Sequence, residues 1–114
     1  MFYTSSTDGY QKPLPGVKIK TLVYGEKTLL TELRFSKGSS LPTHCHPHEQ
    51  TGYIIEGKLK LKVADETFVA NPGDSWSIPS NAEHSAEVLE DTVVVEVFSP
   101  VREDYIPHNG EASY

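Results

Sequence analysis

Short runs of β-branched, aromatic and aliphatic residues recur about every ten residues along this chain, and each run is closed by Gly, Pro, Asn or Asp. Such runs are typical of β-strands joined by tight turns, and no long segment shows the 3.6-residue period of an amphipathic helix. The connections between the runs are short, which favours antiparallel hairpins over crossovers. The pattern therefore predicts an all-β domain, arranged as an antiparallel sandwich or barrel.

The strand boundaries follow from the same alternation. We expect strands at 17–24, 27–35, around 44–46, 52–55, 58–63, 67–70, 75–78, 83–88 and 92–98. Turns are predicted at 56–57, 64–66, 71–74 and 89–91, where turn-forming residues are concentrated. The flanking segments are polar and interrupted by Pro and Gly, so the expected organisation is an N-terminal arm (1–16), a barrel (17–103) and a C-terminal tail (104–114).

Size and charge restrict the classes of function. With 114 residues, the chain fits one domain that can bury a core without disulfides. The formal net charge of -6 and the pI of about 5.3 argue against nucleic acid or an anionic membrane as the main partner, because both require basic surface. The chain has one cysteine and no apolar run long enough for a signal sequence or a membrane span. We expect a soluble, cytoplasmic protein.

The segment around His44 contains the densest group of metal-binding side chains. His44 and His46 are two residues apart, so an extended backbone places both imidazoles on one face and Cys45 on the other. Imidazole binds Zn, Cu, Fe and Ni, and a side-chain oxygen of Glu49 or Gln50 could add a third ligand after a short bend. A further ligand has to come from elsewhere in the sequence. This stretch therefore predicts half of a metal site.

A second segment supplies the missing ligand. A turn at Gly73 and a bend at 79–81 return the chain to the sheet at His84. Together the two segments resemble the two sequence motifs of the cupin family. They read Gly38-x5-His44-x-His46-x3-Gln50-x6-Gly57 and Gly73-x5-Pro79-x-Asn81-x2-His84. Three histidines whose spacing matches both motifs favour a metal site over unrelated core or surface histidines.

The resemblance to cupins covers about residues 17–103. It implies a double-stranded β-helix, the jelly-roll barrel of this family, around one divalent ion. The metal ligands that it implies are His44, His46, Gln50 and His84. These ligands accept several transition metals, so Fe, Ni, Zn and Mn are all candidates.

Three positions depart from the usual cupin pattern: Gln50 replaces glutamate, Asn81 replaces glycine and Val88 replaces asparagine. None of these changes removes a ligand, because an amide oxygen still coordinates and asparagine tolerates the left-handed backbone that glycine would supply. Since Gln50 is neutral, the full charge of a divalent ion stays uncompensated, which favours anionic ligands. Glu49 and His48 remain alternatives to Gln50 if the chain bulges in this segment.

The strand expected at 92–98 carries the remaining candidates. Its alternation places three valines on one face and Glu96 and Phe98 on the other. If the valine face packs in the core, Glu96 is exposed. If Glu96 and Phe98 face the barrel interior, a carboxylate and an aromatic ring lie near the metal, and Arg102 follows after a turn. In that arrangement Glu96 could move a proton and Arg102 could bind a substrate carboxylate.

This strand end also resembles the small pectin-degradation cupins that convert 4,5-unsaturated uronates to their open-chain keto form. That group has the pattern D-x-F-S-P-x-R, matched here by Glu96, Phe98, Ser99, Pro100 and Arg102, with glutamate in place of aspartate. The resemblance implies a metal-dependent isomerase or lyase of carbohydrate metabolism with a small anionic substrate, in which Glu96, Phe98 and Arg102 have catalytic roles. The alternatives are an Fe(II) dioxygenase and a non-catalytic sugar- or effector-binding module. Cupins commonly dimerise, so a homodimer is implied as well.

Overall fold

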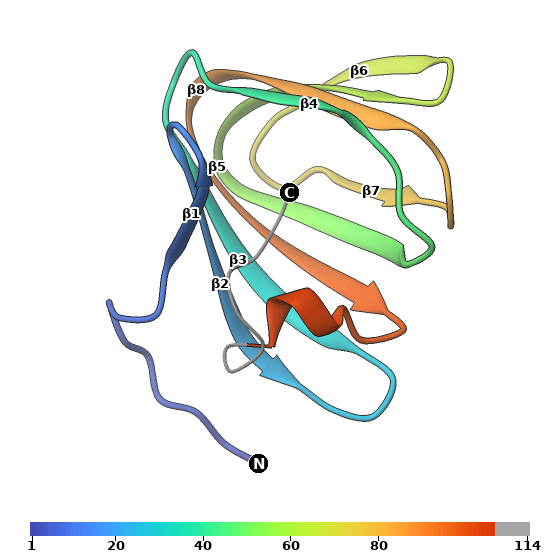
Figure 1. The fold of residues 1–114 in the computed structure, drawn as a ribbon. Coiled ribbons are helices and arrows are strands. Elements are labelled where there is room, and N and C mark those ends of the chain that lie inside the picture. Colours follow the sequence, from blue (N-terminus) through green and yellow to red (C-terminus); the bar gives the residue numbers. More distant parts are fainter. Residues whose placement is uncertain (107–114) are drawn as a thin grey trace.

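The computed structural model describes residues 1–106 of the chain as an all-β domain with one short 3-10 helix (Figure 1). The elements are β1 (Gln11–Leu14), β2 (Val17–Tyr24), β3 (Leu29–Phe35), β4 (Ser40–His44), β5 (Glu49–Val63), β6 (Glu66–Ala70), β7 (Ser75–Ile78), β8 (His84–Ser99) and the helix η1 (Glu103–Tyr105). Most of the expected tail lies outside the described residues. Within them, no helix has the length and apolarity needed to cross a membrane.

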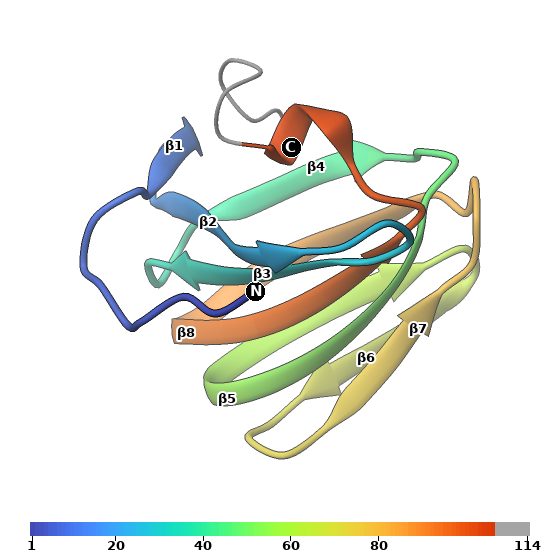
Figure 2. The ribbon, with the colours of Figure 1, turned by 90° about the horizontal axis from the view of Figure 1, so that it is seen from below.

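Two long strands, β5 and β8, take part in both layers of a sandwich (Figures 1 and 2). The first part of β5 pairs with β7 and with the end of β8, and the last part pairs with β6 and with the start of β8. β3 and β2 extend the first layer from the end of β8, and β4 pairs with the start of β8 in the second layer. All of these pairings are antiparallel. The expected jelly roll is confirmed.

The two turns expected at 56–57 and 89–91 are wrong: both segments are bends inside continuous strands. β5 and β8 remain paired through the bend, with irregular register between Ile54 and Leu59. Bulges and glycines allow paired strands to change sheets without ending. Gly57 has φ +98°, and a Cβ atom there would overlap the backbone of Asp91 and Thr92. The turn-type residues therefore bend two paired strands together and pass them from one layer to the other.

Replacing Gly57 by alanine is expected to destabilise the fold more than the same change at Gly73. The two glycines have similar φ values, +98° and +93°, so each variant acquires left-handed strain of about 1–2 kcal/mol. A Cβ atom at Gly73 meets nothing within 4 Å, whereas one at Gly57 overlaps backbone, so we expect Gly57→Ala to cost about 3 kcal/mol or more. Urea unfolding of both variants measures the free energies. Equal losses would show that the bend does not need this close approach.

β1 lies within the segment expected to be an arm and forms an edge of the sheet beside β2. Pro13 inside it is compatible with this position, because an edge strand does not need every backbone N–H for pairing. Just before β1, the Tyr10 hydroxyl donates a hydrogen bond to Glu32 of β3, and the Tyr10 ring lies 5.4 Å from Nζ of Lys20. These contacts hold the end of the arm against the sheet.

The space between the layers is aliphatic over most of its length and polar at one end. The largest fully buried aliphatic side chains are Val17, Ile19, Leu29, Leu33, Ile54, Leu59, Ile78 and Val94. At the end where β4 stops and β5 begins, the buried residues include Gln50, His84 and Glu96, which are 3%, 5% and 4% exposed. Burial of polar groups is unfavourable unless they are paired or bind a ligand. A functional site is therefore expected at this end.

Candidate metal centre

Three histidines meet at the polar end of the barrel. His44 is the last residue of β4 and His84 is the first residue of β8, and the two are register partners, while His46 lies in the loop that leads to β5. The ring centroids are 4.2 Å apart for His44 and His84, 5.1 Å for His46 and His84, and 5.7 Å for His44 and His46. One ring nitrogen of each lies within 4.8 Å of the others, so the three side chains could hold one metal ion.

Backbone carbonyl groups fix the direction of each ring. Nδ1 of His44, His46 and His84 lies 2.9, 3.0 and 2.9 Å from a carbonyl oxygen two residues away in the sequence. Because a carbonyl can only accept a hydrogen bond, Nδ1 carries the proton and the lone pair is on Nε2. Nε2 of His46 and of His84 is buried without a hydrogen-bond partner. Such atoms are rare in folded proteins, and here they are the atoms with which an ion would bond.

Burial keeps the three rings neutral. Desolvation disfavours the charged imidazole and lowers the pKa of His44, His46 and His84, with that of His46 falling to about 4. The positive charge of Arg102 lowers the pKa of all three rings further. Neutral imidazole is the form that binds metal ions. The electrostatics of the site therefore keep the cluster in its metal-binding form at neutral pH.

The loop before β8 is fastened to the loop before β5. The backbone N–H of Asn81 donates to the carbonyl oxygen of His46 at 2.8 Å, and the Ser80 hydroxyl donates to the carbonyl oxygen of Pro47 at 2.5 Å. Asn81 has φ +63°, the left-handed conformation that the sequence predicted for this position. Since His84 follows one loop and His46 lies in the other, these bonds hold the two motifs in register.

Gln50 points towards the cluster from the start of β5. Its Nε2 donates a hydrogen bond to Oε2 of Glu96 at 2.5 Å. With the amide nitrogen directed to Glu96, the amide oxygen remains for the other side, where Gln50 interacts with the His46 ring and partly offsets the lowering of the His46 pKa. The atom of Gln50 that can bind a metal thus faces the histidines.

Glu96 is a carboxylate buried inside the barrel. Glu96 and Phe98 are 4% and 2% exposed, whereas Val95 and Val97 are half-buried on the outer face. Of the two arrangements considered from the sequence, the interior one is observed. Desolvation raises the pKa of Glu96 to about 7, and the hydrogen bond from Gln50 opposes that rise. A carboxyl group with such a pKa can accept and release a proton near neutrality.

Trp76 contacts this carboxylate across Gly52. Gly52 is the register partner of Glu96 on one side and of Trp76 on the other. A Cβ atom at Gly52 would overlap the Trp76 indole, so the ring lies against the glycine and reaches Glu96, whose pKa it lowers. No local sequence pattern indicates this role of Trp76, because the contact depends on the pairing of three separate strands.

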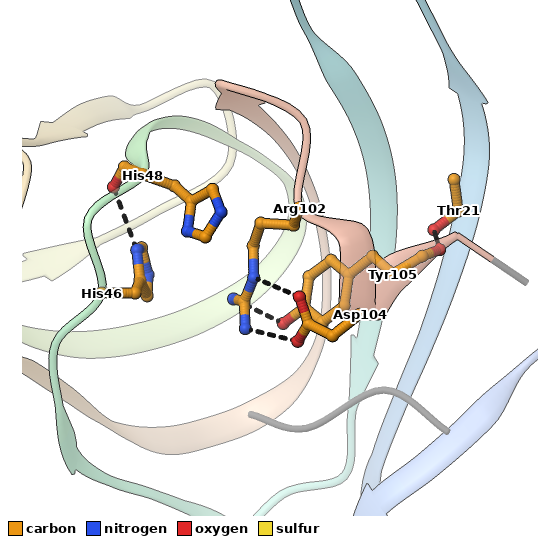
Figure 3. A network of polar contacts seen from close by, with 6 residues as sticks. All are labelled: Thr21, His46, His48, Arg102, Asp104 and Tyr105. Atoms are coloured by element: carbon orange, nitrogen blue, oxygen red, sulfur yellow. Dashed lines mark hydrogen bonds and ion pairs between the residues drawn. The ribbon is translucent and has the colours of Figure 1, made fainter. Parts of the chain in front are cut away.

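Arg102 is buried, and a carboxylate of its own chain binds it (Figure 3). Its guanidinium carbon lies 5.2 Å from the ring centroid of Phe98 and 3.9 Å from that of Tyr105. Nε and Nη2 donate to the two carboxylate oxygens of Asp104 at 3.2 and 2.8 Å, and Nη1 donates to the Tyr105 hydroxyl at 2.9 Å. Asp104 and Tyr105 were not predicted as partners of Arg102, although they follow it within three residues.

The other residues considered as ligands lie outside the cluster. Cys45 and Glu49 are both exposed. The His48 ring lies 5.5 Å from the His46 ring but is not one of the three grouped histidines. Desolvation and the charge of Arg102 lower the pKa of His48, and its Nδ1 is buried without a hydrogen-bond partner.

Proteins of known structure share this fold. KdgF from Halomonas sp. is 28% identical with a TM-score of 0.87, over 93% of this chain and 98% of that structure. An RmlC-like cupin from Shewanella frigidimarina NCIMB 400 is 27% identical with a TM-score of 0.86, over 92% of this chain and 95% of that structure. Oxalate decarboxylase OxdC of Bacillus subtilis (strain 168) is 28% identical over 80 residues, 66% of this chain, and the chain spans 21% of that longer protein. The model of the cupin domain matches residues 31–99, more than half of the sequence, and the chain therefore belongs to the cupin family.

Proposed function

We propose that this chain is a metal-dependent enzyme that acts on a carboxylated sugar, and that its reaction is the opening of 4,5-unsaturated uronates to their open-chain keto form. The observation that carries this proposal is the buried carboxylate of Glu96, hydrogen-bonded to Gln50 beside the three-histidine cluster. This arrangement combines a group that can transfer a proton, Glu96, with a site for a metal ion that can act as a Lewis acid. The similarity to KdgF, and the F-S-P-x-R strand end that resembles the pectin-degradation cupins, support the same class of reaction.

The donor set fits a divalent transition metal and an acidic substrate. The candidate ligand atoms are Nε2 of His44, His46 and His84 and the amide oxygen of Gln50. A bound ion supplies Lewis acidity towards a substrate oxygen. All four donors are neutral, so the protein leaves the charge of the ion uncompensated and favours an anionic ligand. Fe, Ni, Zn and Mn remain the candidate metals.

The proposed reaction is an isomerisation that needs no co-reactant. The anomeric hydroxyl loses its proton as the bond between C1 and the ring oxygen breaks, and C4 gains a proton when the resulting enol becomes a ketone. Glu96 would accept the first proton and return one to C4. Phe98, which lies between His46 at 5.9 Å and Arg102 at 5.2 Å, forms an apolar wall beside the cluster. Arg102 would balance the charge of the uronate carboxylate.

Metal-loaded protein mixed with 4,5-unsaturated galacturonate is expected to remove the absorbance of the conjugated enol. Protein stripped of metal by a chelator is the matched control and should leave the absorbance unchanged. Three other results would contradict the proposal. Unchanged absorbance with fully loaded protein rules out this activity, oxygen uptake with Fe(II) favours a dioxygenase, and tight binding of sugar acids without turnover favours a binding module.

A further inference from the structure

One buried nitrogen near the metal centre, Nδ1 of His48, has no hydrogen-bond partner. Among the described residues, the buried side-chain nitrogens without a hydrogen-bond partner are Nε2 of His46, Nε2 of His84, Nε1 of Trp76 and Nδ1 of His48. The first two face the metal position, and the Trp76 indole lies beside the Glu96 carboxylate. Nδ1 of His48 has no such explanation. A buried polar atom without a partner indicates a missing ligand or water.

The His48 ring lies beside Arg102, on the side of that side chain opposite Asp104 (Figure 3). His48 belongs to the loop between β4 and β5, whose backbone is fixed because the His48 carbonyl accepts the Nδ1–H of His46 at 3.0 Å. Figure 3 shows the His48 ring next to the Arg102 side chain, with Asp104 and Tyr105 on the far side of the guanidinium. The Arg102 charge acts on the His48 ring electrostatically, which agrees with this proximity.

His48 and Arg102 together have the chemistry of a carboxylate site. Asp104 and Tyr105 fix Arg102 from one side, so its charge is held in a defined place next to His48. A neutral imidazole can place its proton on Nδ1 and donate it to an anion. A carboxylate between the two groups would gain a hydrogen bond from His48 and charge balance from Arg102. Hydrogen bonds to a charged group are stronger than those between neutral groups.

We propose that His48 is a substrate-binding residue, whose Nδ1–H donates a hydrogen bond to a carboxylate oxygen of the sugar acid beside Arg102. The inference rests on the proposed function and names the residue that recognises the acidic group of the substrate. Proton transfer is proposed for Glu96, which lies on β8 inside the barrel, whereas His48 lies in the loop before β5. His48 is therefore expected to affect substrate binding and not the proton-transfer step.

Calorimetric titration of 4,5-unsaturated galacturonate into metal-loaded Glu96→Gln protein, which we expect to bind without turnover, tests the inference. Adding His48→Phe keeps a ring of similar size but removes the donor, and should weaken binding at least tenfold. Adding His48→Asn, whose amide can occupy the position of Nδ1, should restore binding to within about threefold of the parent. Glu49→Gln, an exposed change at the next position, is the control and should have no effect. Elemental analysis should find equal metal in all four proteins.

The outcomes separate the two proposals. Equal affinity of the His48→Phe and parent proteins overturns the role of His48 and leaves the proposed function intact. The same conclusion follows if affinity falls only in proportion to lost metal, because His48 would then act through the cluster. If the parent binds no uronate and the wild-type protein opens none, the proposed function fails and the role of His48 fails with it.

Discussion

A His84→Ala protein is expected to lose its bound metal on dialysis, whereas the wild-type protein retains about one ion per chain. Nε2 of His84 is one of four proposed ligand atoms, and it is buried without another partner. Loss of a residue that merely orients a ligand lowers metal affinity by about 10–100-fold, so loss of the ligand itself should exceed that range. Elemental analysis after dialysis measures the effect. Stoichiometric metal in the variant would overturn the ligand set.

His84 is buried, so its replacement also needs a control for stability. His44 is only half-buried, and His44→Ala should lose metal with a smaller effect on the fold. Metal at about 100 times its dissociation constant should stabilise the wild-type protein by about 2.7 kcal/mol and neither variant by a comparable amount. Glu49→Gln, in which an exposed neighbouring carboxylate is neutralised, should retain both the metal and the stabilisation.

A Glu96→Gln protein is expected to turn over 4,5-unsaturated galacturonate about 10²–10⁴-fold more slowly than the wild type. The amide can still accept the hydrogen bond from Gln50, so the position of Gln50 and the metal content should be kept. What the amide cannot do is accept and release a proton. Steady-state kinetics should therefore show a lower kcat with little change in KM, together with unchanged metal by elemental analysis.

Glu96→Asp is the informative companion variant, because it restores the carboxylate of the pectin-degradation pattern with one methylene fewer. Displacement of a catalytic group by about 1 Å can cost about 10²-fold, so this variant should fall between the wild type and Glu96→Gln. An order of wild type, Asp and Gln supports an acid-base role that depends on position. Wild-type kcat in the Glu96→Gln protein would exclude Glu96 from proton transfer.

Local alternation was enough to predict an all-β domain, including a strand at 17–24, because burial on one face is visible in each short segment. It could not separate a turn from a bend. Gly57 suits either, and which one forms depends on whether β5 and β8 stay paired through the segment. β1 was missed for a related reason: Pro13 argues against a strand unless the strand is known to be an edge.

The candidate site, like the fold, could be predicted from the sequence only in part. The spacing of His44, His46 and His84 was sufficient to predict that these residues lie together, because it matches the two sequence motifs of the cupin family. Alternation placed Glu96 and Phe98 on one face, but it could not decide which face is interior, since that depends on the opposite layer. The contacts of Trp76, His48 and Asp104 arise from loop paths and strand order, and no local pattern encodes them.

The carbonyl groups that hold the three histidine rings have a consequence for how this family can change its chemistry. Each ring is oriented by a backbone carbonyl of its own segment and not by another side chain. The positions of the three Nε2 atoms therefore depend little on the other side chains of the interior. Mutations elsewhere in the interior can accumulate without disturbing them. In this chain the glutamine at position 50 and the glutamate at position 96 lie beside these three nitrogens, so substitutions at the two positions are expected to change the reaction while the three nitrogens keep their places.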